Sequence, residues 1–196
     1  GEPVAGATLQ IQDTEGTVLY EWETGKEPVL YEYLPVGNYV LVEIQAPTEE
    51  GYVRAENVPF TVLETGEIQK VEMKDDFTKV QISKVDITTE KEIPGAQIQI
   101  KDKDGNVIEE WVSTEAPHYV EYMPPGDYVL IEALAPTEDG YVKAQDVPFT
   151  VLETGELQTV EMKDDYTKVE ISKTDIATGE PVAGATLQIQ DTEGTV

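Results

Sequence analysis

Short runs of alternating apolar and polar residues follow one another along the chain, with turn residues between them. This alternation is typical of strands with one buried face, and no stretch shows the 3.6-residue period of an amphipathic helix. Seven such runs within an 89-residue unit predict an all-β, Ig-like β-sandwich. The predicted strands of the second unit are residues 80–87, 96–102, 106–112, 119–123, 128–136, 147–151 and 157–164.

The chain also repeats itself. Residues 61–87 return with few changes as 150–176, an offset of 89 residues, and residues 1–18 are identical to 179–196. Repetition at the size of a domain indicates a tandem array, so we expect a window of a longer array. Its expected parts are a repeat that lacks its first strand (1–78), a complete repeat (79–167) and the first strands of a further repeat (168–196).

The joint between repeats is predicted to be short. Only residues 76–79 separate the last strand of one repeat from the first strand of the next, and they contain no Gly/Ser or Pro-rich spacer. Such linkers leave neighbouring domains little freedom. We therefore expect a fairly stiff rod of domains.

Charge narrows the range of partners. The chain has 40 acidic and 13 basic residues, a net charge of -27. Nucleic acids and anionic membranes are bound by clustered cationic side chains, so neither is expected as a partner. We interpret the acidity as a source of solubility and of repulsion between repeats rather than as a binding site. Cysteine is absent, so no disulfide braces these domains, and no run approaches the roughly 20 apolar residues of a membrane span.

Three charged residues fall on strand faces that are otherwise apolar. Lys84, Glu132 and Asp164 each follow two apolar residues in phase, in the runs VQISK, YVLIE and VEMKD. Because alternate side chains of a strand share a face, all three are predicted to point into the core. Unpaired buried charges cost several kcal/mol each, so the three groups must be neutral, hydrogen-bonded to one another or chemically joined.

Two interpretations of this cluster remain open on strand parity alone. The first is a buried structural network of lysine and carboxyl groups. The second is a covalent bond, because burial favours a neutral amine beside neutral carboxyl groups, and a neutral amine is a nucleophile. In that hypothesis Lys84 attacks the carboxyl carbon of Asp164, Glu132 polarises it and relays protons, and a Lys-Asp isopeptide bond forms once, without enzymatic turnover.

Three segments resemble the motifs of CnaB-type, or SpaA-like, domains of Gram-positive surface adhesins and pilins. They are residues 82–111, 128–151 and 160–168, and they occur in the order that the family has them. The resemblance covers the whole second repeat, nearly all of the first, and the tail. It implies a prealbumin-like β-sandwich that forms an isopeptide bond by itself.

The resemblance also assigns roles to single residues. It implies that Lys84 is the reactive lysine of the motif S-K-x-D, that Glu132 is the catalytic glutamate before an A-P-x-G-Y loop, and that Asp164 is the acceptor in M-x-D-x-Y. The loop departs from the family pattern, because the two residues 137 and 138 replace a single one. Asp165 is a rival acceptor, but strand parity directs it to solvent.

The two ends of the chain have complementary gaps. The first repeat has Glu43 and Asp75 in phase with apolar neighbours but no first-strand lysine, whereas the last residues carry Lys173 without a glutamate or an acceptor. We expect Glu43 to be catalytic if the first repeat is completed. The tail of one molecule could then complete the first repeat of another, with Lys173 and Asp75 joined between chains.

Other candidate sites have ordinary structural interpretations. His118 is the only histidine, so no metal site and no cofactor are expected. Residues 102–106 lack the ligand spacing of a calcium loop and instead predict a hairpin turn. Four aromatic residues could form a ligand-binding strip, although half-buried strand aromatics are the commoner case; they are Tyr20, Trp22, Tyr31 and Tyr33.

The predicted function is mechanical. We expect an extracellular stalk or fibre segment of a bacterial surface protein, attached to the cell surface or cell wall and made of internally cross-linked repeats. Its expected partners are adjacent repeats and further copies of itself. The alternatives are an adhesin segment that binds a host or matrix ligand and a polymerising fibre subunit.

Overall fold

The structure is a computed structural model that describes residues 2–195. The chain separates into two compact units, one that ends at Asp165 and one that begins at Tyr166. Nearly all regular structure is β, as the alternation predicts, and it lies in the first unit. The helical elements among these described residues are two single 3-10 turns, η1 (Thr48–Glu50) and η2 (Thr137–Asp139). No described helix is long and apolar enough to cross a membrane.

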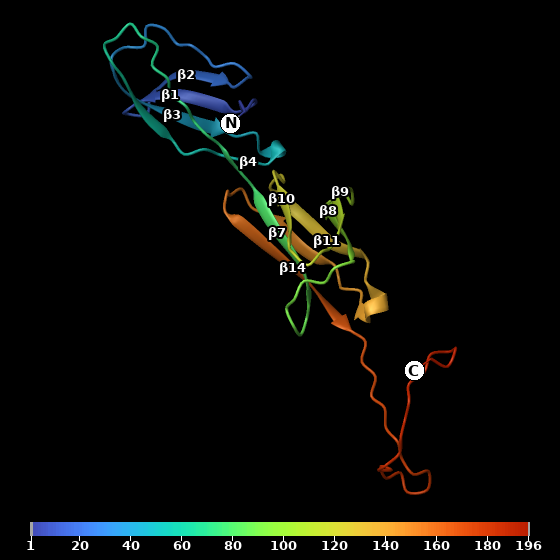
Figure 1. Cartoon of the computed structure of the whole chain (residues 1–196). Coiled ribbons are helices and arrows are strands. Elements are labelled where there is room, and N and C mark those ends of the chain that lie inside the picture. Colours follow the sequence, from blue (N-terminus) through green and yellow to red (C-terminus); the bar gives the residue numbers. More distant parts are fainter. Residues whose placement is uncertain (1, 196) are drawn as a thin grey trace. The chain divides into compact units, whose positions relative to one another are not determined.

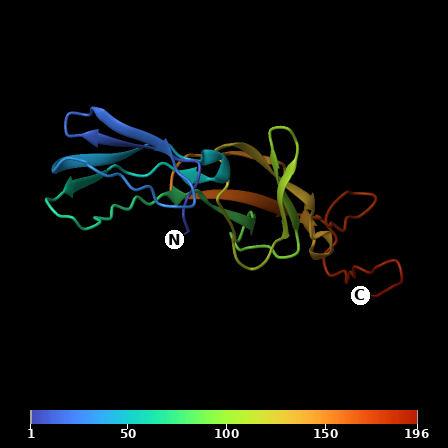
Figure 2. The same ribbon diagram turned by 90° about the horizontal axis from the view of Figure 1, so that it is seen from above.

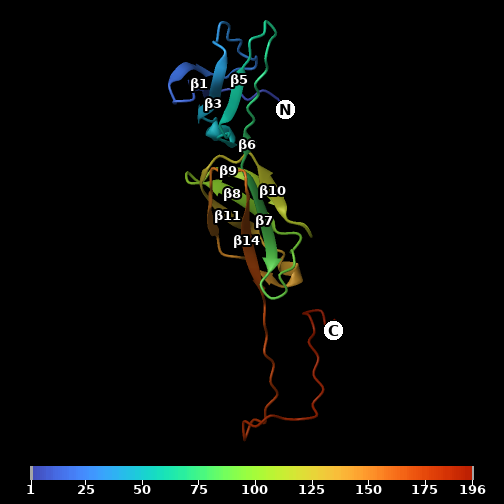
Figure 3. The ribbon, with the colours of Figure 1, turned by 90° about the vertical axis from the view of Figure 1, so that its left-hand side faces the viewer.

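The second repeat is a complete sandwich of two four-stranded sheets (Figures 1 and 3). One sheet has the order β13-β11-β8-β9 and the other β10-β7-β14-β12. All seven predicted strands are present, together with the short additional strand β12. The strands are β7 (Lys79–Asp86), β8 (Gln97–Asp102), β9 (Val107–Val112), β10 (His118–Glu121), β11 (Gly126–Leu134), β12 (Tyr141–Val142), β13 (Val147–Val151) and β14 (Leu157–Tyr166).

The core of this repeat lies between its two sheets. Alternate residues of each strand point inward, so every strand contributes one stripe of apolar side chains. The buried cluster contains ten residues that come from both sheets and their connections. They are Val80, Ile82, Ala96, Ile98, Ile100, Met123, Tyr128, Leu130, Val151 and Met162.

The first and last strands of this repeat are neighbours. β7 and β14 pair in parallel over eight residue pairs, which include Val160 with Ile82 and Met162 with Lys84. Figures 1 and 3 both show the two strands side by side. Parallel strands need a long connection, and here the connection is the rest of the repeat. The pairing extends over the whole of β7 and over residues 157–164 of β14.

The first repeat has one such sheet, with the order β2-β1-β3-β5. The predicted last strand of this repeat, around Val71 and Asp75, does not form: residues 63–75 contain no strand (Figure 2). Its counterpart β14 forms on β7, and residues 2–78 contain no strand equivalent to β7, so the backbone of residues 63–75 lacks a partner. The strands are β1 (Thr8–Asp13), β2 (Val18–Glu23), β3 (Gly37–Gln45), β4 (Tyr52–Val53), β5 (Val58–Val62) and β6 (Asp76–Phe77), and β6 pairs with β4.

The tail also departs from the prediction. Strands were expected in residues 168–196, but the described part of this segment contains only turns and one isolated bridge, between Thr174 and Pro181. The bridge repeats the one between Val85 and Glu92 in the second repeat. The local turn therefore forms from its own sequence, whereas the strands do not form without a sheet to join.

Candidate functional site

Three neighbouring strands bring a lysine and two carboxyl groups into the core of the second repeat. Lys84 lies on β7, Glu132 on β11 and Asp164 on β14, each in the inward phase that the alternation predicts. Lys84 is 3% exposed, and both acidic residues are fully buried. Two strands of one sheet and one strand of the other thus place the three groups between the sheets.

The three groups contact one another directly. The Nζ atom of Lys84 lies 3.1 Å from Oε1 of Glu132 and donates a hydrogen bond to Oδ1 of Asp164. The other Glu132 oxygen, Oε2, accepts a 2.6 Å hydrogen bond from the backbone N–H of Ala144. Among the described residues, Oδ2 of Asp164 has no hydrogen-bond partner, and Oε1 of Glu132 has only the ion pair. The amine is therefore held between two carboxyl groups.

Burial shifts the acid–base balance of this cluster. Desolvation raises the pKa of Asp164 to about 6, against an ordinary value of 3.8. The hydrogen bond and charge of Lys84 act in the opposite direction, whereas the charge of Glu132 raises this pKa further. Because two carboxylates compete for one cation in a low-dielectric site, Asp164 retains its proton at a pH where an exposed aspartate is ionised.

The neighbouring acid is placed differently. Asp165 lies on the exposed face of β14, as parity predicts, while Asp164 faces the amine. The two adjacent residues therefore have opposite environments.

Sequence reasoning missed the backbone group that orients Glu132. The N–H of Ala144 fixes one carboxyl oxygen, and the N–H of Ala55 does the same for Glu43 at 2.6 Å. These two alanines are 89 residues apart, like the two glutamates. The repeat offset could have identified the pair, although a backbone donor leaves no signature in side-chain patterns.

The first repeat contains the same carboxyl groups without the lysine. Glu43 is fully buried, and its Oε1 has no hydrogen-bond partner among the described residues. Asp75 is half-buried. Desolvation raises the pKa of both residues, and the charge of Asp75 raises the pKa of Glu43 further. Within the described part of the chain, this site therefore has the two acids but no buried cation.

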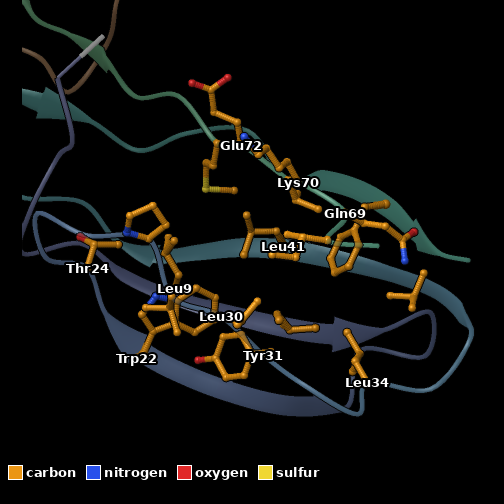
Figure 4. A pocket seen from close by; sticks show the side chains of 18 of the residues that line it. Leu9, Trp22, Thr24, Leu30, Tyr31, Leu34, Leu41, Gln69, Lys70 and Glu72 are labelled. Atoms are coloured by element: carbon orange, nitrogen blue, oxygen red, sulfur yellow. The ribbon is translucent and has the colours of Figure 1, made fainter. Parts of the chain in front are cut away.

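A groove opens over these acids. Its volume is about 1430 Å³, and its lining includes Glu43 and Asp75. Figure 4 shows Leu9, Trp22 and Tyr31 on the sheet side, across from the segment that carries Lys70 and Glu72. The groove occupies the place where the second sheet packs in the complete repeat. The core of the first repeat is therefore partly open.

The remaining candidate lysine lies in the second unit. Lys173 is exposed, as are the apolar residues Val169 and Ile171 that precede it in phase, at 81% and 57%. In the complete repeat, the equivalent side chains of Val80 and Ile82 are buried. The tail therefore carries an apolar stripe that its own unit leaves exposed.

The aromatic candidates belong mostly to packing. Tyr20 and Trp22 both pack against Tyr31, with ring centroids 4.4 and 5.1 Å apart, and all three are half-buried. Tyr33 differs, because it is 96% exposed. A continuous exposed strip of the four rings does not exist.

The other polar candidates have structural roles. The ring of His118 stacks on Trp111 at 4.2 Å and lies 3.3 Å from Glu109. The Asp102 carboxylate accepts backbone hydrogen bonds from residues 104 and 106, which closes the predicted hairpin turn. Among residues 2–195, no cluster of histidine and acidic side chains could hold a metal ion.

The β-sandwich, together with the motifs that carry Lys84, Glu132 and Asp164, points to one family of β-domains. The profile of the SpaA prealbumin-like fold domain matches the chain twice, over residues 1–76 and 78–166. The chain therefore belongs to the SpaA prealbumin-like family, the family that the sequence motifs indicate. A comparison with curated proteins gave no match.

Several solved structures are similar. The TIE protein of Bacillus anthracis is 27% identical, with a TM-score of 0.47, over 84% of this chain and 32% of that one. The shaft pilin SpaA of Lactobacillus rhamnosus GG is 14% identical, with a TM-score of 0.41, over 87% and 91% of the two chains. BcpA, the major pilin subunit of Bacillus cereus, is 12% identical, with a TM-score of 0.40, over 84% and 95%. The chain spans about a third of the length of the TIE protein.

Proposed function

We propose that the chain is a segment of a structural stalk or fibre whose repeats are cross-linked by internal isopeptide bonds. The observation that carries the proposal is the buried amine of Lys84, which contacts the carboxyl groups of both Glu132 and Asp164. Membership of a family found in pilins supports the mechanical role. The repeats then belong on the outside of a Gram-positive cell, attached to its surface or wall.

The bond forms by condensation. Glu132 takes a proton from the Nζ atom of Lys84, which becomes a neutral amine and attacks the carboxyl carbon of protonated Asp164. A C–N bond forms and a C–O bond breaks, and Glu132 delivers the proton with which the leaving hydroxyl departs as water. The second proton that the nitrogen loses then goes to Glu132, which ends protonated beside the neutral amide. Holding the reactants in contact removes about 7–11 kcal/mol of the barrier. The reaction consumes its own residues, so the repeat is not an enzyme.

Denaturing mass spectrometry of the intact chain tests this proposal. We expect a mass lower by one water than the sequence requires, and this deficit should vanish in Lys84→Ala, Glu132→Ala and Asp164→Ala. Asp165→Ala is the matched control and should keep the deficit, because that carboxyl group lies on the opposite face of β14. A full sequence mass in the unmodified chain would leave the cluster as a buried polar network.

We also propose that copies of this chain associate head to tail. In this arrangement residues 168–175 of one molecule enter the open groove of another as its missing first strand. The groove supports the proposal because it contains the buried, partly unpaired Glu43, and the tail supplies Lys173 behind an apolar stripe. Completion would place Lys173 beside Glu43 and Asp75 and permit the same condensation between chains.

Sedimentation velocity and denaturing gels separate the two steps of this association. The unmodified chain should form concentration-dependent oligomers in sedimentation and a covalent ladder on the gel. Lys173→Ala should keep the oligomers and lose the ladder. Ile171→Asp should lose both, because a carboxylate on the inward face prevents strand insertion. A chain that stays monomeric at every concentration rules out this association.

The adhesin alternative has less support. A ligand-binding strip requires exposed aromatic side chains, and of the four candidates only Tyr33 is exposed. Saturable binding of a host ligand, lost on replacement of exposed aromatics, would be the evidence in its favour.

A further inference from the structure

The connection between the two repeats is tightly hydrogen-bonded. Thr78, which separates β6 from β7, is fully buried. Its N–H donates to the carbonyl of Gly51 at 3.0 Å, and its carbonyl accepts from the N–H of Tyr122 at 3.0 Å. Its hydroxyl donates to the carbonyl of Met123 at 2.6 Å. One connecting residue therefore joins a loop of the first repeat to a loop of the second.

Gly51 is required at this joint for a geometric reason. Its backbone has φ 80°, and a Cβ atom there would collide with the backbone of Tyr122. Only glycine combines a left-handed backbone with so close an approach.

Three aromatic rings complete the joint. Tyr122 stacks on Phe77, with centroids 4.2 Å apart and an interplanar angle of 19°, and meets Tyr52 edge-on at 5.4 Å. The Nζ atom of Lys79 lies 4.6 Å from the centre of the Phe77 ring. Tyr122 has φ 57°, which is unusual for a residue with a side chain. The surrounding contacts hold it in this strained backbone conformation.

Tyr122, the residue that the second repeat contributes to the joint's aromatic stack, has a counterpart in the first repeat. Tyr33 precedes Tyr122 by 89 residues and has nearly the same left-handed backbone, with φ 62°. Its ring is 96% exposed, however, against 43% for Tyr122. Tyr33 therefore keeps the strained conformation without burying its ring in its own repeat. A polar residue such as asparagine would adopt this backbone more readily.

The remaining residues of the joint have counterparts within the second repeat and at its end. Gly140 has φ 84°, as Gly51 has φ 80°. The Nζ atom of Lys168 lies 4.6 Å from the Tyr166 ring, the same distance that separates Lys79 from Phe77. The joint residues Gly51, Tyr52, Phe77, Thr78 and Lys79 thus have counterparts 89 residues later. These counterparts are Gly140, Tyr141, Tyr166, Thr167 and Lys168.

We propose that the loop that carries Tyr33, between β2 and β3, is a docking surface for the carboxyl-terminal end of a second copy of this chain. In the docked state the Tyr33 ring stacks on Tyr166 of the second copy and meets its Tyr141 edge-on, which reproduces the internal joint. This inference rests on the proposed head-to-tail association, because strand insertion delivers residues 166–168 next to the first repeat. The docking fixes the angle between molecules and extends the stiff internal joint across the chain boundary.

Tyrosine nitration at different protein concentrations tests the docking. The chain is treated with tetranitromethane when dilute and when assembled, and each tyrosine is quantified by peptide mass spectrometry. We expect the reactivity of Tyr33 to fall roughly twofold on assembly, the ratio of 96% to 43% exposure. Tyr119 is the internal control, because it is 59% exposed and lies outside the joint. Its reactivity should not change.

A partner variant makes the result specific. In Tyr166→Ala, assembly should persist, because the inserted strand is intact, while Tyr33 should regain the reactivity of the dilute chain. Oligomers in which Tyr33 of the unmodified chain stays fully reactive would overturn the docking and leave strand insertion standing. A chain that sediments as a monomer at every concentration overturns both proposals.

Discussion

The site places ionisable groups where apolar side chains would normally pack. The neighbours of Lys84, Glu132 and Asp164 along their strands are buried Ile82, Leu130 and Met162. Removing a charged group from water costs several kcal/mol, and pairing offsets this cost only when the geometry is excellent. Condensation would turn the amine and one carboxyl group into a neutral amide. The reaction would therefore also relieve the burial penalty that the unreacted residues impose.

Glu132 is the residue on which the reaction rate should depend most. We expect Glu132→Gln to slow bond formation by about 10²–10⁴, the usual contribution of a positioned acid–base group. Glutamine keeps an oxygen for the N–H of Ala144 but cannot relay a proton. The measurement is the growth of the mass deficit with time after synthesis.

A second carboxyl group beside the lysine provides the control. Glu92 accepts a 3.0 Å hydrogen bond from the backbone N–H of Lys84 but does not contact the amine. The variant Glu92→Gln should react at the normal rate. An equal loss of rate in both variants would mean that Glu132 acts only through the local fold.

The raised pKa of Asp164 predicts a pH-dependent stability in the unreacted Glu132→Gln variant. A folded-state pKa above the ordinary 3.8 means that the folded state binds the proton more tightly than the unfolded chain. The stability from this group is complete below pH 3.8 and is lost as pH rises through the folded value. The loss should be about 1–3 kcal/mol, since one pKa unit corresponds to about 1.4 kcal/mol.

Urea unfolding between pH 4 and 7 measures this loss. The double variant Glu132→Gln/Asp164→Asn is its control, because every other carboxyl group is retained. The difference between the two curves should change as pH rises from 4 toward the raised folded-state pKa of Asp164 and should stay constant above it. A constant difference at all pH values would show that the pKa of Asp164 is not raised.

At the scale of elements, two nearly identical segments have different structures. Residues 157–164 lie within β14, whereas their counterparts 68–75 contain no strand. Hydrogen–deuterium exchange should therefore be slow in the first segment and fast in the second. A synthetic peptide with the sequence of residues 79–86 should slow exchange in residues 68–75, because it supplies the missing parallel partner. A peptide with aspartate in place of its isoleucine should have no such effect.

Strand parity explains which parts of the site the sequence could predict. Phase along a single strand was sufficient to assign Lys84, Glu132 and Asp164 to the interior. Strand formation also depends on a neighbouring strand, and the predicted strands near Asp75 and in the tail do not form among the described residues. The N–H of Ala144 and the backbone of Tyr122 were missed because they depend on three-dimensional contacts rather than on residue type.

At the scale of the whole molecule, the proposed bond ties the first strand of the repeat to its last. Lys84 and Asp164 are 80 residues apart in sequence. Closing a loop of this length removes roughly 4–5 kcal/mol of unfolded-state entropy, by analogy with disulfides. We expect Asp164→Asn to lower the unfolding free energy of the second repeat by about this amount. The fluorescence of Trp111 in guanidinium measures it, in a Trp22→Phe background.

A reducing agent separates this bond from a disulfide. The unfolding curve of the unmodified chain should be the same with and without dithiothreitol, because the sequence has no cysteine. Pulling on the two ends of the repeat should extend only the residues outside the bonded loop. Full extension of residues 84–164 under force would contradict the cross-link.

The parallel pairing of β7 and β14 also has a consequence for synthesis on the ribosome. β7 emerges first, yet its partner is the last strand of the repeat to be made. Until β14 appears, one edge of β7 has no partner, and nascent chains with such edges are prone to mispairing. The next repeat begins with VEISK, nearly the same sequence as VQISK in β7. The order of translation therefore protects each repeat, because its own first strand is already in place when the competing copy is made.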